Sequence, residues 1–171
     1  YDVTATIGNI TQSGSLTVSG ASTFETKAEN GTIFCFDSSC TSAGDTNNAF
    51  SGTVKLTTTG SSAHVYIDNG TTALQIAGGS SVGGNLTLVS GNASGITDSG
   101  TVTVGGNLKA TTDANSGVIN MVNLAVDGSI ALTTDGTGDA TIVNDAGLVF
   151  ATSTIGGDLT ATATTLNISD I

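Results

Sequence analysis

The stretch Val104-Gly-Gly-Asn-Leu108-Lys-Ala110 decides the fold, because its pattern of apolar, glycine and polar residues returns along the chain. Strong copies of the pattern also begin at Val82, Val126 and Ile155, and a weaker copy begins at Val18. The strong copies thus begin at positions 82, 104, 126 and 155, at steps of 22, 22 and 29 in the numbering. Such steps predict a repeated structural unit of about twenty residues, with one insertion.

A second alternation of apolar and polar residues lies upstream of the glycine pair. Residues Ile96 to Val104 match Ile10 to Val18 almost letter for letter. Period-two alternation places the apolar side chains on one face of a strand. Strands this short cannot bury that face alone, and no stretch between the units has the 3.6-residue period of a covering helix. The chain is therefore expected to wind, so that successive units cover one another.

Winding predicts an all-β fold, a right-handed parallel β-helix (β-solenoid) with coils of roughly 20–23 residues. We expect a single domain over residues 1–171, with apolar side chains stacked about 4.8 Å apart in a shared interior. The predicted core stack consists of Val82, Leu86, Val104, Leu108, Val126, Ile130, Ile155 and Leu159. A positive φ or a close backbone approach is expected at the coil corners, where it would disfavour a Cβ atom. The predicted corner residues are Gly84, Gly106, Gly128 and Gly157.

The middle of the chain, roughly residues 25–81, keeps short strand-like apolar pairs but loses the register of the repeat. These pairs are expected to form coils with a shorter or shifted third side. The segment 35–50 is rich in Ser, Asp, Asn and Gly, which predicts a loop excursion out of the solenoid. Cys35 and Cys40 are expected to close the base of this loop as a disulfide, which indicates an oxidising compartment.

The net charge of −11 excludes several classes of partner. Lys27, Lys55 and Lys109 are the only strong bases and arginine is absent, so the chain lacks the basic surface that nucleic acids and anionic lipids require. No apolar run approaches the roughly 18 residues needed to cross a bilayer, which predicts no membrane insertion. The 24 glycines without a single proline are typical of regular sheet ladders, in which every residue must donate an N–H.

Catalytic groups are scarce, and we expect neither enzymatic activity nor a cofactor. His64 is the only histidine, and alternation places it on the face opposite Val65 and Ile67, where it is expected to contact solvent. Polysaccharide lyases also use β-helices, but their chemistry needs a basic residue near clustered carboxylates. The three lysines of this chain lie at dissimilar positions, which argues against such a site.

Oxygen-rich turns such as Asp135 to Asp139 suit calcium, yet neither the EF-hand spacing nor the nonapeptide of calcium-loaded β-rolls is present. We interpret these aspartates as turn formers and expect no metal site. Threonine alternation at residues 101–103 and 160–164 is the feature that favours an ice-binding face. Asn-x-Ser/Thr sequons would mark exposed corners if the source glycosylates asparagine; they begin at Asn9, Asn30, Asn69, Asn85, Asn92 and Asn167.

The run Gly8 to Gly20, together with the repeated Val-Gly-Gly-Asn-Leu-Thr-Leu pattern, resembles the repeats of filamentous-haemagglutinin-like exoproteins of the two-partner secretion type. The resemblance covers most of residues 8–30 and 82–161. It implies a secreted, cell-surface adhesin built as a long right-handed β-helix. The spacing of Cys35 and Cys40 departs from the shafts of that family, which seldom carry a short cysteine loop.

We expect the chain to serve as a non-catalytic structural segment of an extracellular or cell-surface fibre or adhesin. Its expected partner is itself, through adjacent coils or copies of the chain, with a host or environmental glycan or protein as a further candidate. One alternative is a self-assembling, pilus-like filament subunit that polymerises by end-to-end or donor-strand β-pairing. The other alternative is a glycan-binding or ice-binding solenoid.

Overall fold

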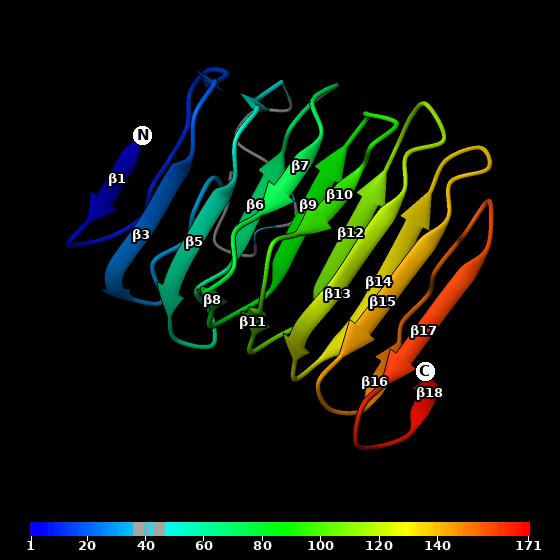
Figure 1. The fold of residues 1–171 in the computed structure, drawn as a ribbon. Coiled ribbons are helices and arrows are strands. Elements are labelled where there is room, and N and C mark those ends of the chain that lie inside the picture. Colours follow the sequence, from blue (N-terminus) through cyan, green and yellow to red (C-terminus); the bar gives the residue numbers. More distant parts are fainter. Residues whose placement is uncertain (36–39, 41, 43–46) are drawn as a thin grey trace.

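The structure, a computed structural model, describes residues 1–35, 40, 42 and 47–171. The described residues wind into a β-solenoid of about seven turns, which succeed one another from the N-terminus to the C-terminus (Figure 1). The regular elements of this part of the chain are strands, and it contains no helix that could cross a membrane. The predicted all-β parallel solenoid is confirmed.

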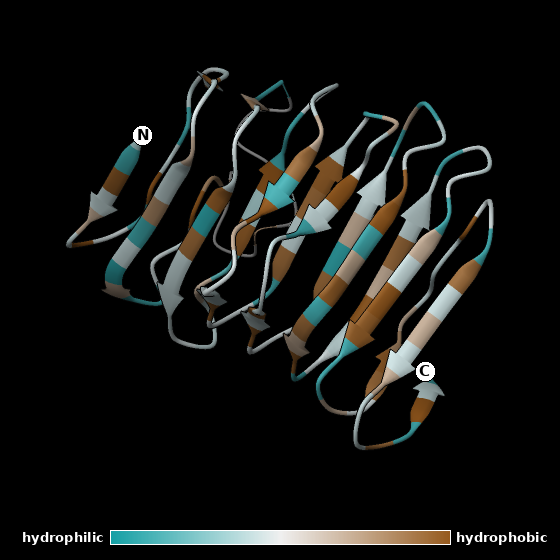
Figure 2. Ribbon diagram, viewed as in Figure 1, coloured by the Kyte–Doolittle hydropathy of each residue, from teal (hydrophilic) through white to brown (hydrophobic). Residues whose placement is uncertain are grey.

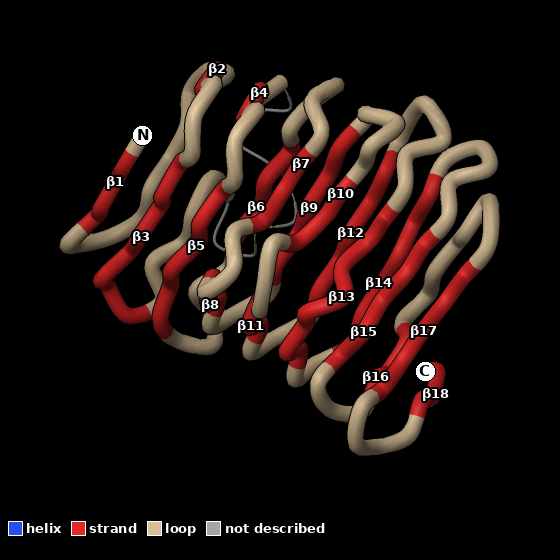
Figure 3. Tube along the Cα trace, in the orientation of Figure 1, coloured by secondary structure: helices blue, strands red, loops and turns tan. Residues whose placement is uncertain are grey.

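Three parallel sheets form the sides of the coils, and Figure 3 shows their strands side by side, with loops between them. The ten-stranded sheet contains β1 (Asp2–Ala5), β3 (Ser22–Glu29), β5 (Val54–Thr59), β7 (Leu74–Ile76), β8 (Ser80–Val82), β10 (Ile96–Asp98), β11 (Val102–Val104), β13 (Ile119–Val126), β15 (Ala140–Asn144) and β17 (Leu159–Ala163). The six-stranded sheet contains β6 (Val65–Asp68), β9 (Leu86–Ser90), β12 (Leu108–Thr112), β14 (Ser129–Thr134), β16 (Leu148–Phe150) and β18 (Ile168–Asp170). The two-stranded sheet pairs β2 (Thr17–Val18) with β4 (Ala49–Phe50).

The length of a coil follows from the residues that pair across neighbouring strands, which lie about 22 residues apart in the sequence. In the six-stranded sheet, Leu86 pairs with Leu108 and Leu108 pairs with Ile130, so the two steps are equal. In the ten-stranded sheet, Val104 pairs with Val82 on one side and with Val126 on the other, which is the same step. Both sheets therefore advance by 22 in the numbering from one coil to the next, which lies within the coil length of roughly 20–23 residues predicted from the repeat.

The later part of the middle, from β5 onward, keeps this coil length, whereas the coil before it departs from the register of the repeat. Val54 pairs with Ile76 across β5 and β7, which is the step of the regular coils. Val65 pairs with Leu86 across β6 and β9, a step that is shorter by a single position. The middle lacks the Gly-Gly-Asn phrase, but stacking of the apolar face alone fixes the register of a strand, because a slip by one residue would turn that face outward.

One coil is longer than its neighbours. Ser22 pairs with Val54, and Ile33 forms a bridge with Val65, so both sides of this coil advance by 32 in the numbering, from 22 to 54 and from 33 to 65. The loop excursion predicted near residues 35–50 falls within this coil. Residues 36–39, 41 and 43–46 lie outside the described part of the chain, and the course of the excursion stays a prediction.

The interior is a column of apolar side chains that runs through the described coils, and brown bands recur along the strands in Figure 2. Strand β12 illustrates the alternation, since Leu108 and Ala110 are buried whereas Lys109 is exposed. Each buried Leu or Ile side chain stabilises the fold by roughly 1.5–3 kcal/mol relative to an exposed one.

Three phenylalanines fill the column around the long coil, whereas the coils of residues 82–132 use non-aromatic side chains. The rings of Phe24 and Phe34 meet edge to face with centroids 4.7 Å apart, and those of Phe24 and Phe50 meet in the same way at 5.6 Å. All three side chains are at most 2% exposed. Aromatic rings bury more area per residue than aliphatic side chains, which suits a coil that carries additional residues.

The last copy of the repeat, which begins at Ile155, occupies a different corner from the other strong copies. Leu159 pairs with Ala140 in the ten-stranded sheet, whereas the partner of Ile130 in the next coil is Phe150. Both steps, from 140 to 159 and from 130 to 150, are slightly shorter than those of the regular coils. The insertion inferred from the longest step of the repeat is therefore wrong. The phrase marks a coil corner, but it does not mark the same corner every time.

Two members of the predicted core stack differ from the rest. Leu159 is 46% exposed, and Ile155 is only partly buried against the side of the column. The reason is that β17 pairs with β15 alone, so no described coil covers Leu159 from the other side. The remaining six members are at most 2% exposed: Val82, Leu86, Val104, Leu108, Val126 and Ile130.

Candidate functional site

The glycines Gly84, Gly106 and Gly128 stack on one another where successive coils enter the six-stranded sheet. None of the three has a positive φ, so conformational freedom is not what these positions require. A Cβ atom on Gly106 would lie 2.8 Å from the carbonyl carbon of Gly84, and one on Gly128 would lie 2.8 Å from that of Gly106. Close approach of neighbouring coils therefore accounts for them. Gly157 lies at a different corner, where a Cβ atom would be 3.0 Å from the carbonyl oxygen of Gly138.

A ladder of side chains runs along this glycine corner. Asn85 Oδ1 accepts a hydrogen bond from the backbone N–H of Asn107 (2.9 Å), and Asn107 Oδ1 accepts one from the N–H of Ser129 (2.9 Å). His64 Nδ1 accepts the equivalent bond from the N–H of Asn85 (2.8 Å). The glycines make room for these side chains, since a Cβ atom on Gly84 would collide with the imidazole. We call His64, Asn85, Asn107 and Ser129 the corner ladder.

The position of His64 corrects the expectation of a solvent-facing side chain. The residue is half-buried, and its Nδ1 bonds the next coil. The bond between His64 and the next coil was not predicted, because His64 lies outside every copy of the Gly-Gly-Asn repeat pattern. One signal could have found it: His64 stands directly before Val65, as Asn85 stands directly before Leu86, and those two apolar residues pair with each other.

Buried asparagines, among them Asn69 and Asn144, tie coils together at other corners, and these roles were not predicted from the sequence. Asn69 accepts a hydrogen bond from the N–H of Phe50 (2.8 Å) and donates one to the carbonyl oxygen of the same residue (3.1 Å). Asn144 bonds the N–H and carbonyl of Val126 at the same two distances, 2.8 and 3.1 Å. Both asparagines are at most 1% exposed. Their amides supply the hydrogen bonds that a strand partner would otherwise provide.

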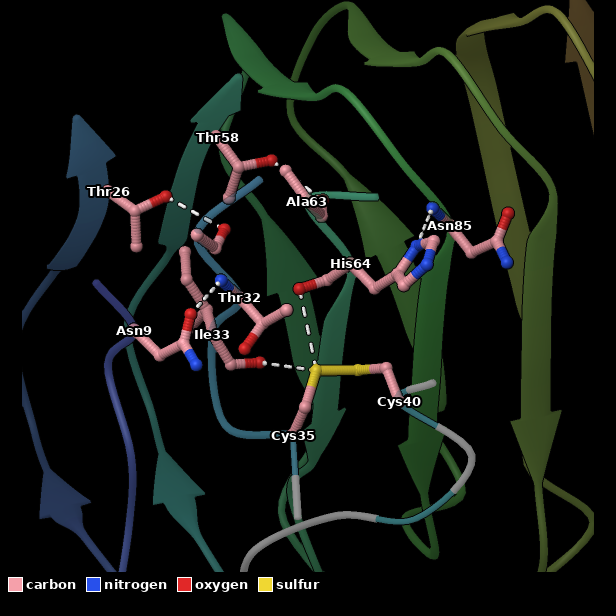
Figure 4. Close-up of a disulfide and its surroundings, with 11 residues drawn as sticks. Asn9, Thr26, Thr32, Ile33, Cys35, Cys40, Thr58, Ala63, His64 and Asn85 are labelled. Carbon is pink, nitrogen blue, oxygen red and sulfur yellow. Dashed lines mark hydrogen bonds between the residues drawn. A yellow bond between two sulfur atoms is a disulfide. The ribbon is translucent and has the colours of Figure 1, made fainter. Parts of the chain in front are cut away.

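Buried threonines close the turns at the ends of several strands. In each case the side-chain hydroxyl donates a hydrogen bond to a backbone carbonyl four or five residues further along, which satisfies a carbonyl inside the coil corner. The pairs are Thr26 with Gly31 (3.0 Å), Thr58 with Ala63 (2.9 Å), Thr112 with Gly117 (2.7 Å) and Thr134 with Gly138 (2.7 Å). Figure 4 includes Thr26 and Thr58.

The disulfide between Cys35 and Cys40 lies beside the first rung of the corner ladder (Figure 4). The two Cα atoms are 4.7 Å apart, and each cysteine is 7% exposed. Cys35 Sγ is 3.4 Å from the carbonyl oxygens of both Ile33 and His64. Ile33 forms β-bridges with the coils on both sides, so the disulfide is anchored where the long coil meets its neighbours.

Asp139, in the turn before β15, and Asp98, at the end of β10, bond residues of neighbouring coils. Asp139 Oδ1 accepts a hydrogen bond from the N–H of Asp158 (2.8 Å), which repeats the geometry of the corner ladder. The carboxylate of Asp98 accepts two bonds from Asn123, one from its N–H (3.0 Å) and one from its Nδ2 (2.8 Å). Within the described ranges, no group of three or more Asp, Glu, His and Cys side chains is close enough to hold a metal ion.

A lane of uncharged polar side chains crosses the outer face of the ten-stranded sheet. Its members pair from coil to coil in the order Gln75, Thr97, Asn120, Thr141 and Thr160. Thr103, from the other threonine-rich stretch, pairs instead with Ser81 and Ala125. The two stretches therefore belong to different lanes and do not combine into one regular threonine array.

The sequons do not all mark exposed corners. Asn69 is fully buried, and Asn85 uses its side-chain oxygen in the corner ladder. Asn167, in contrast, is exposed in the turn before β18. Burial would keep a glycosylating enzyme from the Asn69 amide of the folded chain.

Comparison with known proteins adds one finding. A family model described as repeats of unknown function (DUF5649) matches residues 1–34. No curated protein and no solved structure matches the chain. The match agrees with the repeat character of the solenoid, but it covers a small part of the chain and brings no activity with it.

Proposed function

We propose that the chain is a non-catalytic structural segment in the shaft of an extracellular or cell-surface fibre or adhesin of the filamentous-haemagglutinin-like kind. The observation that carries the proposal is the unbroken stacking of coils. Parallel strand pairs, the apolar column and the corner ladder all run along one axis. In such an arrangement each coil contacts only its neighbours, so a shaft lengthens by the addition of coils.

The use of polar side chains at the corners supports a structural role. Nδ1 of His64 and the carboxylates of Asp98 and Asp139 each accept hydrogen bonds from the backbone of a neighbouring coil. A general acid or base must instead direct its titrating atom toward a substrate. These groups serve the contact between coils.

The disulfide and the charge support an extracellular location. A buried disulfide such as Cys35–Cys40 persists in an oxidising compartment and is rare in the reducing interior of cells. The net charge of −11 keeps copies of a sheet-rich particle apart, which matters for a protein with exposed strand edges.

Assembly of the purified chain tests the proposal. A shaft segment is expected to stay monomeric in size-exclusion chromatography with light scattering, and to form no filaments in negative-stain images at any concentration used. Long uniform filaments would overturn the shaft proposal in favour of a self-assembling subunit. That rival is favoured by β17, which pairs on one side only and carries the exposed Leu159. If filaments form, Leu159→Lys should abolish them, because it places a charge at the pairing edge.

A further inference from the structure

Strand β13 contains a β-bulge that turns two neighbouring side chains outward. Met121 and Leu124 are three positions apart, whereas their partners in β15 are two apart. Of the residues between them, Val122 is 40% exposed and Asn123 is exposed as well. A regular strand would turn one of these two side chains inward. The bulge therefore presents an apolar and a polar side chain next to each other on the outer face, and bulges often aim side chains in this way beside functional sites.

The bulge lies in a hollow of about 210 Å³, which residues from four successive coils line. Its apolar part consists of Val122, Leu124 and Val143. The hollow is smaller than the roughly 300–1,000 Å³ of pockets for drug-sized ligands, so it suits a single small ring. It is formed by the sides of the coils and by neither end of the solenoid. A ligand bound there is consequently independent of the shaft proposal and of any pairing between ends.

The polar residues of the hollow are fixed by contacts between coils. The carboxylate of Asp98 accepts hydrogen bonds from the backbone N–H and from Nδ2 of Asn123. Because a carboxylate can only accept, the nitrogen of this amide must face Asp98, and its Oδ1 faces away from it. Asp145, which is exposed directly after β15, donates its backbone N–H to the carbonyl oxygen of Leu124 (2.9 Å) and accepts the hydroxyl of Thr164 on its own carbonyl oxygen. The hollow therefore holds acceptors on a rigid frame.

The strands around the hollow carry almost no charge. Strands β10, β11, β13, β15 and β17 contain one charged residue, Asp98, whose carboxylate is engaged by Asn123. The strong bases of the chain lie on β3, β5 and β12, as Lys27, Lys55 and Lys109. An anionic ligand would meet no base among the residues that line the hollow, and it would approach against the net charge of −11. The ligand that fits this face is therefore uncharged.

We propose that the hollow at the bulge binds one neutral sugar ring of a glycan. A sugar ring has an apolar face of C–H groups, which suits Val122 and Val143, and hydroxyl groups at its edge. The amide oxygen of Asn123 and the carboxylate of Asp145 accept hydrogen bonds from these hydroxyls. The rival ligand is a basic side chain of a peptide, since the carboxylate also attracts an ammonium group. The sugar fits better, because valine side chains give an ammonium group nothing in exchange for its water.

Backbone amide spectra of the ¹⁵N-labelled full chain test the site residue by residue. The probes are the methyl glycosides of glucose, galactose, mannose and N-acetylglucosamine, each titrated separately to millimolar concentrations. At least one of them should shift the amides of Val122, Asn123 and Asp145 along a saturable curve. The amides of Thr87 and Lys109, which pair on the six-stranded sheet, are controls in the same molecule and should stay in place. The absence of a saturable shift at the hollow with all four glycosides, or an equal shift at the controls, would overturn the proposal.

A pair of variants separates the hollow from the charge of the whole chain. Asp145→Asn should raise the dissociation constant of the bound glycoside about tenfold, the factor that corresponds to one charge-assisted hydrogen bond. Asp127→Asn is the matched control, because Asp127 is likewise exposed directly after a strand of the same sheet, and it should bind as the wild type does. Equal weakening in both variants would show that net charge and not the hollow is responsible, and would overturn the proposal.

The rival ligand is tested with Nα-acetyl-lysine amide, which keeps its side-chain ammonium group. This probe should leave the amides of the hollow in place at the concentrations that saturate the glycoside. Tighter binding of the lysine probe than of every glycoside would replace the sugar with a basic peptide. The wild-type titrations decide the question without a variant if Asp145→Asn fails to fold.

Discussion

The coils of residues 82–132 and the long coil that carries the cysteines solve the same packing problem in different ways. The regular coils repeat one solution, in which Leu86, Leu108 and Ile130 pair at equal steps and an asparagine ladder follows the glycine corner. The long coil, which advances further along the sequence before it pairs, uses three phenylalanine rings in the core and a disulfide at the edge.

The difference shows what equal coil length provides. When successive coils have the same length, the same residue type can be stacked on itself, and each side chain finds its partner one repeat away. When one coil is longer, its atoms no longer fall opposite their equivalents, and larger rings and a covalent tie stabilise it instead. Substitutions in the regular coils should therefore destabilise the protein by disturbing the stacking of equivalent residues. Substitutions in the long coil should do so by disturbing its phenylalanine packing or its disulfide.

The largest effect is expected in the column of the regular coils. Val104→Asp should destabilise the chain by more than about 4 kcal/mol, because the side chain is 0% exposed and the new carboxylate would have no partner. Thr103→Asp is the matched control, since Thr103 is the exposed neighbour on the same strand, and it should cost less than about 1 kcal/mol. Urea unfolding followed by circular dichroism measures both. Equal tolerance at the two positions would contradict the facing of β11.

A smaller effect is expected at the glycine corner of the regular coils. Gly106→Ala should cost about 2–3 kcal/mol, since the added Cβ atom would lie 2.8 Å from the backbone of Gly84. The control is Gly20→Ala, where a Cβ atom would meet nothing within 4 Å, and the change should stay below about 0.5 kcal/mol. If thermal unfolding shows the same loss for both variants, close approach is not the reason for the corner glycines.

The fold could be predicted from the sequence because its causes recur. Period-two alternation and a constant step apply the same constraint in every regular coil, so Val82, Val104 and Val126 could be placed on one face from the sequence alone. The phrase that begins at Ile155 was placed wrongly, since glycine and a small polar residue mark a close approach but do not say which corner of the coil approaches.

The roles of the polar side chains could not be predicted in the same way. His64 and Asn69 act on residues about one coil away in the sequence, and which residue that is depends on the length of the intervening coil. The long coil changes that offset for everything it contacts. Local composition identifies a turn former, whereas the partner of its side chain follows only from the register.

A more local effect is expected from the disulfide. The double variant Cys35→Ala, Cys40→Ala should lower the free energy of unfolding by about 2 kcal/mol, the loop-entropy value for so short a loop. The loss should concentrate in the long coil: hydrogen exchange should accelerate more at Ile33, which bridges both neighbouring coils, than at Leu108 in the regular coils. Equal acceleration at both amides would mean that the two regions unfold as one unit and do not differ as described.

The smallest effect on stability is expected at alkaline pH. It arises at Tyr66 in β6, the strand that lies between the long coil and the regular coils. Burial, together with the negative charges of Asp68 and Asp113, raises the pKa of the Tyr66 phenol. An unfolded tyrosine loses its proton near about pH 10, so the folded state holds the proton to higher pH than the unfolded state does. The contribution of Tyr66 to stability should consequently be constant below about pH 10 and fall as the pH rises above it. Tyr66→Phe should flatten this alkaline fall in urea unfolding, and Asp68→Asn should reduce it in part. A wild-type profile that persists in Tyr66→Phe would assign the fall to another group.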